Sequence, residues 1–299
     1  MEMLNEILGI KYPVIQGGMA NIATGEFAAV ISNAGGLGLV GAGGLSAELV
    51  RKEIQTAKKN TDKPFGVNIM LMNPEADEIA KVVIEEGVKF VTTGAGSPGK
   101  YMEAWKNAGI TIIPVVAATA LAKRMEALGA DMIIAEGTES GGHVGELTTM
   151  ALVPQVCDAV NIPVIAAGGI ADNRQFKAAL CLGAIGVQIG TSLLVSKECP
   201  IHDNYKAAVI KAKDGDTIVT GRIAGTPVRV LKNSMSREYV KQEKAGADKM
   251  ELEKFTLGSL RKAVFDGDTT NGSLMAGQVC GMLNEIRPAK DILKNICGY

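Results

Sequence analysis

The sequence predicts an eight-stranded parallel β/α barrel, and three observations carry this prediction. Short apolar runs recur along the 299 residues, and each is followed by a segment compatible with a helix. The runs are continuously apolar rather than alternating, as expected of parallel strands buried on both faces. Glycine is abundant, with 36 residues, and recurs directly after the runs, where tight turns would join strand to helix. A doubly wound open sheet is the alternative topology.

Eight such units follow one another along the chain. Ser46 is a candidate N-cap for the second helix, and the third strand carries a polar residue, Asn68, inside its apolar run. The predicted strands are residues 12–16, 37–40, 65–70, 89–93, 111–116, 132–135, 164–167 and 186–189; the predicted helices are residues 24–33, 46–59, 74–86, 100–108 and 118–128, a segment ending near 160, and one that begins after Asp172.

Barrels place their chemistry at the carboxyl ends of the strands, so the strand ends are the candidate site positions. They are residues 17–19, Asn68, residues 92–94, Ala117, Glu136, His143, residues 168–169 and residues 188–191.

The pattern changes after Thr191. Residues 200–270 are rich in charge, with two or three helical stretches and little indication of strands. We therefore expect residues 1–199 and 271–299 to form the barrel, and residues 200–270 to form a helical insertion after the eighth strand that covers the barrel mouth. The segment from Gly272 is predicted to begin a final helix that ends near Asn295 and completes the barrel wall.

Composition and charge narrow the classes of function. The formal net charge is −1, which gives no reason to expect binding to nucleic acid or to a membrane surface. The five cysteines are odd in number and include no Cys-x-x-Cys pair, so neither a disulfide framework nor a structural zinc site is expected. Because no signal-like leader or long apolar run stands out, a cytoplasmic location is expected.

Two glycine turns in the last pair of units predict an anion site. Gly168-Gly169 and Gly190-Thr191 stand where the seventh and eighth strands end and helices begin. Backbone N–H groups at helix N-termini are unpaired and carry positive partial charge, and glycine lets a ligand approach the main chain. Barrels bind phosphate at this place, so these four residues are the candidate phosphate site. The alternative is that glycine only ends the strands, as at residues 41–44.

His143 is the candidate catalytic residue. It lies in a glycine-rich loop, residues 141–145 (GGHVG), after the sixth strand. Glycine on both sides would let a flat ligand lie against the backbone while the imidazole acts as a donor or an acid/base. No Ser/His/Asp order or carboxylate pair stands out, and few acid/base groups are present. A phosphate site in such a barrel indicates that a cofactor supplies the reactive group.

Residues 94–100 (GAGSPGK) match two nucleotide-binding patterns, neither of which fits its context. A Walker loop needs a hydroxyl residue of the Ser/Thr kind after its lysine, and Tyr101 stands there. A Rossmann fingerprint needs an acidic residue at the end of the next strand, and residues 112–117 contain none. A turn at the barrel mouth is the better interpretation.

With these residues in place, the chain resembles the FMN-dependent enoyl-acyl-carrier-protein reductases of bacterial fatty-acid synthesis, the FabK type of flavin barrel. Part of the resemblance is shared with the nitronate monooxygenases, which have a similar barrel, FMN site and loop histidine. Residues 63–71, 121–126 and 275–278 look closer to the reductases. The matching segments cover nearly the whole length and are residues 12–19, 62–71, 91–96, 141–145, 163–172 and 272–278.

The resemblance implies a TIM barrel that binds FMN and assigns roles to particular residues. The four residues of the candidate phosphate site would hold the FMN phosphate. His143 would lie beside the flavin and the substrate, as a donor or as an organiser of the site, and Met275 and Gln278 would lie on the substrate side. The flavin ring and ribityl chain would be held by Gly18, Met19, Asn68, Glu136, Gly141 and Gln188.

The same resemblance implies the reaction and its partners. Hydride would pass from NADH or NADPH through FMN to the β-carbon of a trans-2-enoyl thioester carried by acyl carrier protein. The choice of nucleotide stays open, because the insertion is the part that matches the family least. Activation by a monovalent cation and a homodimeric assembly are further expectations of the resemblance.

Other functions remain open at this point. A nitronate monooxygenase would use His143 to abstract the α-proton of a nitroalkane, with oxygen completing the cycle. A cofactor-free barrel isomerase or aldolase acting on a sugar phosphate would need a Schiff-base lysine or a carboxylate at a strand end, and only Glu136 qualifies. A non-enzymatic binding barrel is the remaining alternative.

Overall fold

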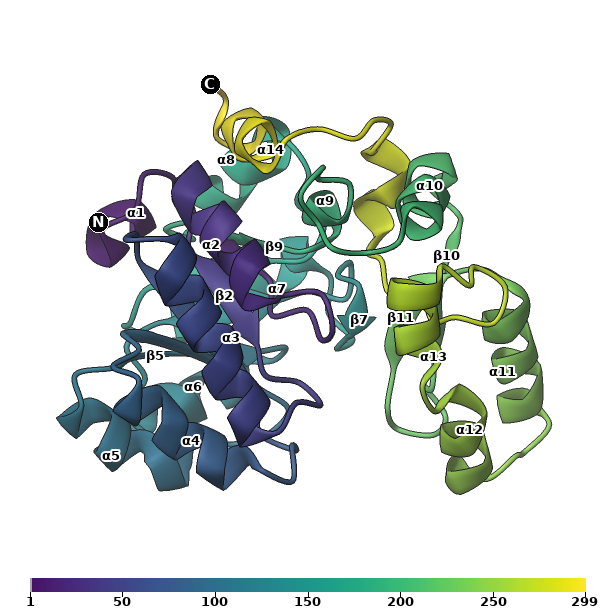
Figure 1. Ribbon diagram of the computed structural model, residues 1–299, viewed down its shortest axis with the longest axis horizontal. Helices are drawn as coiled ribbons and strands as arrows, with labels where there is room; N and C mark the ends of the chain where they lie inside the picture. Colours follow the sequence, from purple (N-terminus) through teal and green to yellow (C-terminus); the bar gives the residue numbers. More distant parts are fainter. Residues whose placement is uncertain (1) are drawn as a thin grey trace.

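The computed structural model describes residues 2–299, and its centre is a closed barrel of eight parallel strands (Figure 1). The strands are β1 (Val14–Gln16), β2 (Gly38–Gly41), β3 (Phe65–Met70), β4 (Phe90–Gly94), β5 (Thr111–Val116), β6 (Ile133–Glu136), β8 (Val164–Ala167) and β9 (Val187–Ile189). They lie in the order β1-β9-β8-β6-β5-β4-β3-β2. A parallel bridge between Ile15 and Leu37 joins β1 to the start of β2. The predicted fold class is therefore confirmed.

Apolar side chains fill the barrel, which explains why its strands are continuous apolar runs. Alternate residues of a barrel strand point inward. Leu39 and Ile165 belong to the cluster inside the barrel, whereas Val67 faces the surrounding helices. The short helix α1 (Leu4–Leu8) adds Leu4 and Leu8 to the inner cluster. This helix closes the barrel at the amino ends of its strands.

Helices surround the barrel on the outside (Figure 1). The predicted cap at Ser46 is present, because its hydroxyl accepts a hydrogen bond from Leu49 N at 3.3 Å. None of the helices within residues 2–299 is long and apolar enough to cross a membrane. The helices of the barrel wall are α2 (Gly25–Ala34), α3 (Ala47–Asn60), α4 (Ala76–Glu85), α5 (Met102–Asn107), α6 (Thr119–Ala127), α7 (Thr149–Ala159), α8 (Asn173–Cys181) and α14 (Ala289–Cys297).

The insertion contains a β-hairpin as well as helices, so the expectation of little strand was wrong. Its strands β10 (Thr217–Thr220) and β11 (Val228–Leu231) pair antiparallel, and β11 pairs with a two-residue strand, β7 (Gly142–His143). The sequences TIVT and VRVL are rich in β-branched residues, but they are short and stand among charged segments. The helices of the insertion are α10 (Asp203–Lys211), α11 (Ser234–Lys244), α12 (Lys249–Thr256) and α13 (Ser259–Arg261). A single-turn helix, α9 (Thr191–Leu194), precedes the insertion, directly after β9.

The final helix also differs from its prediction. Residues 272–277 form no helix; Met275 instead bridges Val230 of β11 in antiparallel fashion. A short 3₁₀ helix follows at Gln278–Met282, and α14 begins only after Pro288. Proline is favoured at a helix start and disfavoured inside one, which explains why the helix begins there. The boundaries of the insertion at residues 200 and 270 stay a prediction.

Candidate active site

A layer of polar side chains lies at the carboxyl ends of the barrel strands, above the apolar filling. Ala167 belongs to the inner cluster, and Glu136 and Gln188 are its register partners on the two neighbouring strands. All three therefore lie on the inner face. Asn68 and Thr92 are partners in the same way, and the Thr92 hydroxyl donates to the Asn68 amide oxygen at 2.8 Å. Strand-end positions far apart in the sequence thus form one polar floor.

Two atoms on adjacent strands of this mouth lack hydrogen-bond partners. Gln188 Oε1 is buried and accepts no bond, and Gln16 Nε2 is buried and donates none, among residues 2–299. The other end of the Gln16 amide accepts from Leu39 N at 3.1 Å. An unpaired buried polar group costs free energy, so Gln188 Oε1, on the inner face, favours a polar ligand at the barrel mouth. Gln16 pairs in register with Ile189, so its side chain lies on the other face of the sheet.

Glu136 is the ionisable group of the polar floor. Burial raises the pKa of its carboxyl from 4.5 to about 7, and a hydrogen bond that Ser140 Oγ donates to Glu136 Oε1, at 3.0 Å, opposes the rise. No lysine, arginine or histidine within residues 2–299 forms an ion pair with it. Near neutral pH Glu136 is therefore present in both protonation states.

This shift predicts a pH dependence of stability that Glu136→Gln removes. Above the unfolded pKa of 4.5 the unfolded chain releases the proton while the folded protein keeps it until about pH 7. The carboxyl therefore lowers the free energy of unfolding as pH rises through this window, by about 3 kcal/mol in total. Urea denaturation of flavin-free protein at several pH values, with Glu136→Gln as the reference, measures this difference. Parallel curves for the two proteins would contradict it.

Glycines allow close approaches between the predicted cofactor-binding residues. A Cβ atom on Gly18 would lie 2.1 Å from the Asn68 side chain, so Gly18 packs directly on that amide. Gly190 lies beside Met19, whose Sδ would be 3.6 Å from an added Cβ. The structure thus brings Gly18 to Asn68 and Met19 to Gly190.

The candidate phosphate site has the expected turn geometry and one unexpected neighbour. Gly168 and Gly169 have φ values of 91° and 77°, which strongly favour glycine. The hydroxyl of Thr191 accepts from Gly277 N at 2.9 Å. The neighbour is Glu139, whose carboxylate would lie 2.0 Å from a Cβ on Gly169 and accepts from the backbone of α7. The sequence did not indicate this role for Glu139.

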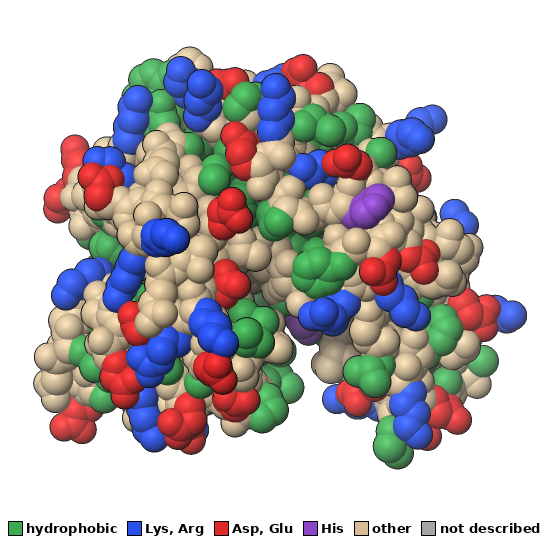
Figure 2. Space-filling model, in the orientation of Figure 1, with side chains coloured by type: hydrophobic (Ala, Val, Ile, Leu, Met, Phe, Trp, Pro, Cys, Tyr) green, Lys and Arg blue, Asp and Glu red, His purple; other side chains and the backbone are tan. Residues whose placement is uncertain are grey.

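His143 opens onto a cleft of about 480 Å³. Figure 2 shows the surface hollowed between the barrel and the insertion. Partial burial among the surrounding atoms lowers the pKa of the imidazole below its ordinary value of 6.5, so the neutral form predominates at neutral pH. A neutral imidazole carries one N–H donor and one acceptor. The barrel and the insertion both line the cleft. Gly43, His143 and Met275 lie outside the insertion, and the insertion contributes Val228, Tyr239 and Arg261.

The two residues predicted on the substrate side differ in position. Met275 lines the cleft with His143, and its Sδ would lie 3.5 Å from a Cβ on Gly142. Gln278 is exposed and does not line this cleft, and its backbone N–H donates to Glu139 O at 2.9 Å. Gly141 packs against the backbone of Ala276, 2.7 Å from an added Cβ. The structure therefore places Met275, but not Gln278, beside the imidazole.

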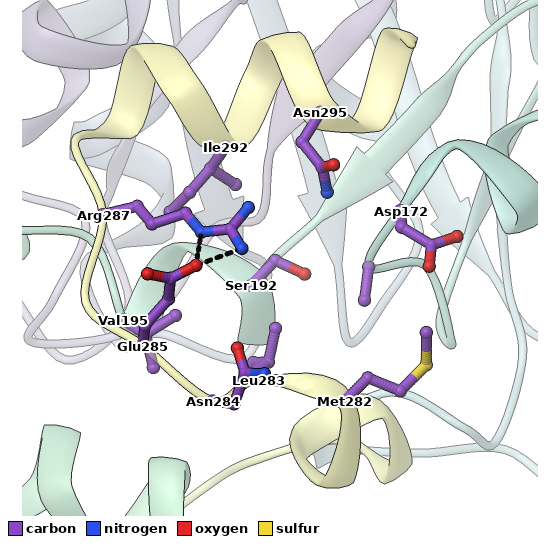
Figure 3. A pocket seen from close by; sticks show the side chains of 11 residues that line it. Asp172, Ser192, Val195, Met282, Leu283, Asn284, Glu285, Arg287, Ile292 and Asn295 are labelled. Atoms are coloured by element: carbon purple, nitrogen blue, oxygen red, sulfur yellow. Dashed lines mark hydrogen bonds and ion pairs between the residues drawn. The ribbon is translucent and has the colours of Figure 1, made fainter.

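A second cavity of about 230 Å³ lies among α8, α9 and α14 (Figure 3). An ion pair between Glu285 and Arg287 lies on one side of it and Asp172 on the other, while Asn295 reaches in from α14. Its lining includes Ser192, next to Thr191 of the candidate phosphate site, but not His143. We assign this cavity no part in the chemistry.

Some residues of the mouth carry no sequence signal of their role. Arg229 is buried within the insertion hairpin, where charge alone indicates an exposed position. Alternation in VRVL could have indicated a strand, but not which face is buried. Tyr205 of α10 donates its hydroxyl to Met275 O at 2.8 Å, a contact between segments far apart in sequence.

Comparison with known proteins agrees with this geometry. The sequence model of the nitronate monooxygenase family matches residues 1–298. The structure of FabK from Thermotoga maritima is similar over 100% of this chain and 96% of that chain, with a TM-score of 0.97 and 47% identity. A probable nitronate monooxygenase of Staphylococcus saprophyticus is 38% identical over 76% of this chain and 77% of its own length. A carboxyl-CoA dehydrogenase of Mycobacterium tuberculosis is 32% identical over 98% of this chain and 94% of its own.

The closed barrel, its polar mouth and these similarities define an FMN-dependent oxidoreductase. The chain belongs to the nitronate monooxygenase family, and it resembles the FabK type over its full length.

Proposed function

We propose that this protein reduces the double bond of trans-2-enoyl thioesters on acyl carrier protein, with NADH or NADPH as the reductant. The observation that carries the proposal is the 47% identity to FabK across the whole chain, with a TM-score of 0.97. The curated relatives named as nitronate monooxygenases are 31–38% identical. The proposal that acyl carrier protein carries the substrate rests only on the similarity to FabK.

The residues at the barrel mouth fit an FMN. Unpaired Gln188 Oε1, on the inner face of the barrel, offers an acceptor for the polar edge of a flavin. The close contact between Gly18 and Asn68 leaves a side-chain-free surface for the ring, and the backbone around Gly168–Gly169 and Gly190 would hold the phosphate. When bound, FMN supplies the path for hydride from NAD(P)H to the β-carbon of the enoyl thioester.

His143 would act on the other end of the enoyl group. Its neutral imidazole can donate its N–H to the thioester carbonyl oxygen, where negative charge develops as the β-carbon receives hydride. A proton then adds at the α-carbon and completes the reduction of the double bond. The insertion side of the cleft would cover the substrate and exclude water. Met275 would pack against the acyl chain beside the imidazole.

Three further features stay predictions, the first two from the resemblance and the third from the sequence. They are a homodimeric assembly, activation by a monovalent cation and a cytoplasmic location. Within residues 2–299 no group of three or more His, Cys, Asp or Glu side chains could hold a metal ion. A monovalent cation would therefore need mainly backbone and neutral oxygen ligands.

Nitronate oxidation is the second candidate, because several curated relatives carry the name of probable nitronate monooxygenases. In that reaction a neutral His143 would accept the α-proton of a nitroalkane. The same residues would hold FMN, so the fold does not separate the two reactions.

The visible spectrum of the purified protein, recorded without oxygen, separates them. We expect absorbance bands near ~450 nm from the flavin cofactor, bleaching on addition of NADH or NADPH, and recovery on addition of crotonyl thioester. Titration with each nucleotide in turn identifies the preferred one. If neither nucleotide bleaches the flavin but a nitronate does, the reductase proposal is wrong and nitronate oxidation is the function.

A further inference from the structure

We propose that Arg229, in the hairpin of the insertion, is a positioning residue that holds His143 facing the cleft. The inference rests on the proposed role of His143 in the reaction. It assigns the insertion a task beyond covering the barrel mouth, since one of its strands would set the orientation of the imidazole.

The sequence of the strand that carries His143 is too short and too rich in glycine to fix its register against β11. β7 is only two residues long, Gly142 and His143, and glycines flank the histidine loop. In antiparallel pairing with β11, His143 lies opposite Val228 and Gly142 lies opposite Arg229. Register is weakly determined in short glycine-rich strands, and a slip of one residue turns every side chain to the other face. Contacts outside the strand must therefore fix this register.

The two faces of the small sheet have different surroundings. His143 and Val228 lie opposite each other and both line the cleft. Arg229 is the next residue along β11, so its side chain lies on the opposite face, where it is 6% exposed. A slip of one residue would remove the imidazole from the cleft.

Arg229 bonds the strand of the insertion to the histidine loop from this buried face. Its Nε donates to Thr138 O at 3.0 Å, five residues before His143, and its Nη1 donates to Thr217 Oγ1 of β10 at 3.0 Å. Val144 N, directly after His143, donates to Pro227 O at 3.2 Å. The loop is thus joined to the hairpin on both sides of the imidazole.

The guanidinium is costly to bury, which argues against an incidental position. Arg229 forms no ion pair within 4.0 Å among the described residues. Burial lowers its pKa, as does the neighbouring charge of Arg222, while Glu139 acts in the opposite direction. A buried charge is tolerated when its hydrogen bonds are made, and here they go to a carbonyl and a hydroxyl whose positions define the loop.

The barrel holds the same loop from the other side. Glu139 Oε1 accepts from Thr149 N, at the start of α7, at 2.8 Å. Glu139 O accepts from Gln278 N at 2.9 Å. Two adjacent residues before His143 are thus fastened, Thr138 to the hairpin and Glu139 to the barrel, and Val144 is bonded to the hairpin directly after it. Removal of Arg229 would release Thr138.

Hydrogen exchange on the FMN-loaded protein tests this directly, with Arg229→Met compared with Arg237→Met. Arg237 is exposed on α11, so the control carries the same substitution without loss of a buried contact. In Arg229→Met we expect the amides of residues 138–145, Val144 above all, to exchange about tenfold faster or more. The barrel strands should exchange as before. We expect kcat to fall about tenfold, with a much smaller change in KM for the nucleotide.

Two histidines in the chain allow a second readout by NMR of labelled imidazoles, with His202 as the internal reference. In Arg229→Met the His143 signal should shift or broaden while that of His202 stays in place. Thr217→Val, which removes only the acceptor of Nη1, should give a smaller change in the same direction, and it replaces Arg229→Met if that variant does not fold. Arg229→Lys, which keeps the charge and can still bond Thr138 O, should recover part of the protection.

Unchanged exchange at residues 138–145 in Arg229→Met, or unchanged kcat in an active enzyme, would overturn the inference. Exchange and NMR do not depend on any substrate. If the wild-type protein shows no reductase turnover but Arg229→Met still releases the loop, the proposed function is wrong and the positioning role of Arg229 stands.

Discussion

Replacing His143 with alanine is expected to lower kcat for enoyl thioester reduction by about tenfold or more, as for other losses of a donor or acid/base group. The imidazole is the histidine that lines the cleft, and its lowered pKa keeps it as a neutral donor. FMN content should stay near that of the wild type, because the phosphate and ring contacts lie on other strands. Steady-state kinetics with crotonyl thioester, together with the ratio of flavin to protein, measure both quantities.

The matched control is His202→Asn. His202 is exposed at the start of α10, where its ring accepts from Asn204 N at 3.1 Å, and asparagine can keep such a cap. Turnover of this variant should equal that of the wild type. If His143→Ala also retains near-normal turnover, the proposed role of His143 is wrong.

Replacing Gly190 with aspartate is expected to weaken FMN binding by about 100-fold or more, because a carboxylate would face the flavin phosphate at short range. The protein itself has room for the new side chain. An added Cβ makes only ordinary contact with Met19 Sδ, at 3.6 Å, and the φ of Gly190, −125°, lies outside the left-handed region that favours glycine. The variant should therefore fold normally and purify with little flavin. Absorbance and fluorescence titration with FMN measure the loss.

Gly190→Ala separates charge from bulk at the same position, and it should weaken binding much less. Gly169 would be a poorer choice, because its positive φ and the adjacent Glu139 carboxylate would strain the protein itself. A full complement of flavin in folded Gly190→Asp would argue that the phosphate lies elsewhere.

The barrel could be predicted because the apolar runs in the sequence show which segments are strands buried on both faces. Residues 65–70, 111–116 and 164–167 were predicted with the same bounds that the structure gives. Strands of this kind are mostly apolar, because both of their faces are buried. Residues 164–167 are in addition followed directly by Gly168, which marks the end of that strand. The positions at the carboxyl ends then follow from topology, which is how Asn68, Glu136 and Gln188 could be named before their shared polar floor was known.

The parts that failed depend on contacts between distant segments. β7 has two residues and becomes a strand only because β11 pairs with it. Residues 272–277 form no helix, because Leu274 and Met275 pair with β11. Arg229 is of a residue type that is usually exposed, yet its side chain is buried. No local pattern encodes these features, since tertiary contacts override propensity.

The link between Arg229 and Thr138 also has a consequence for the order of assembly. It joins residues 91 positions apart in sequence, whereas most barrel strands pair with near neighbours along the chain. Closing a long loop costs entropy before its contacts form, so distant pairings come late in folding. During synthesis, a chain that has emerged only as far as β9 already holds all eight barrel strands, but its histidine loop still awaits the hairpin that orders it.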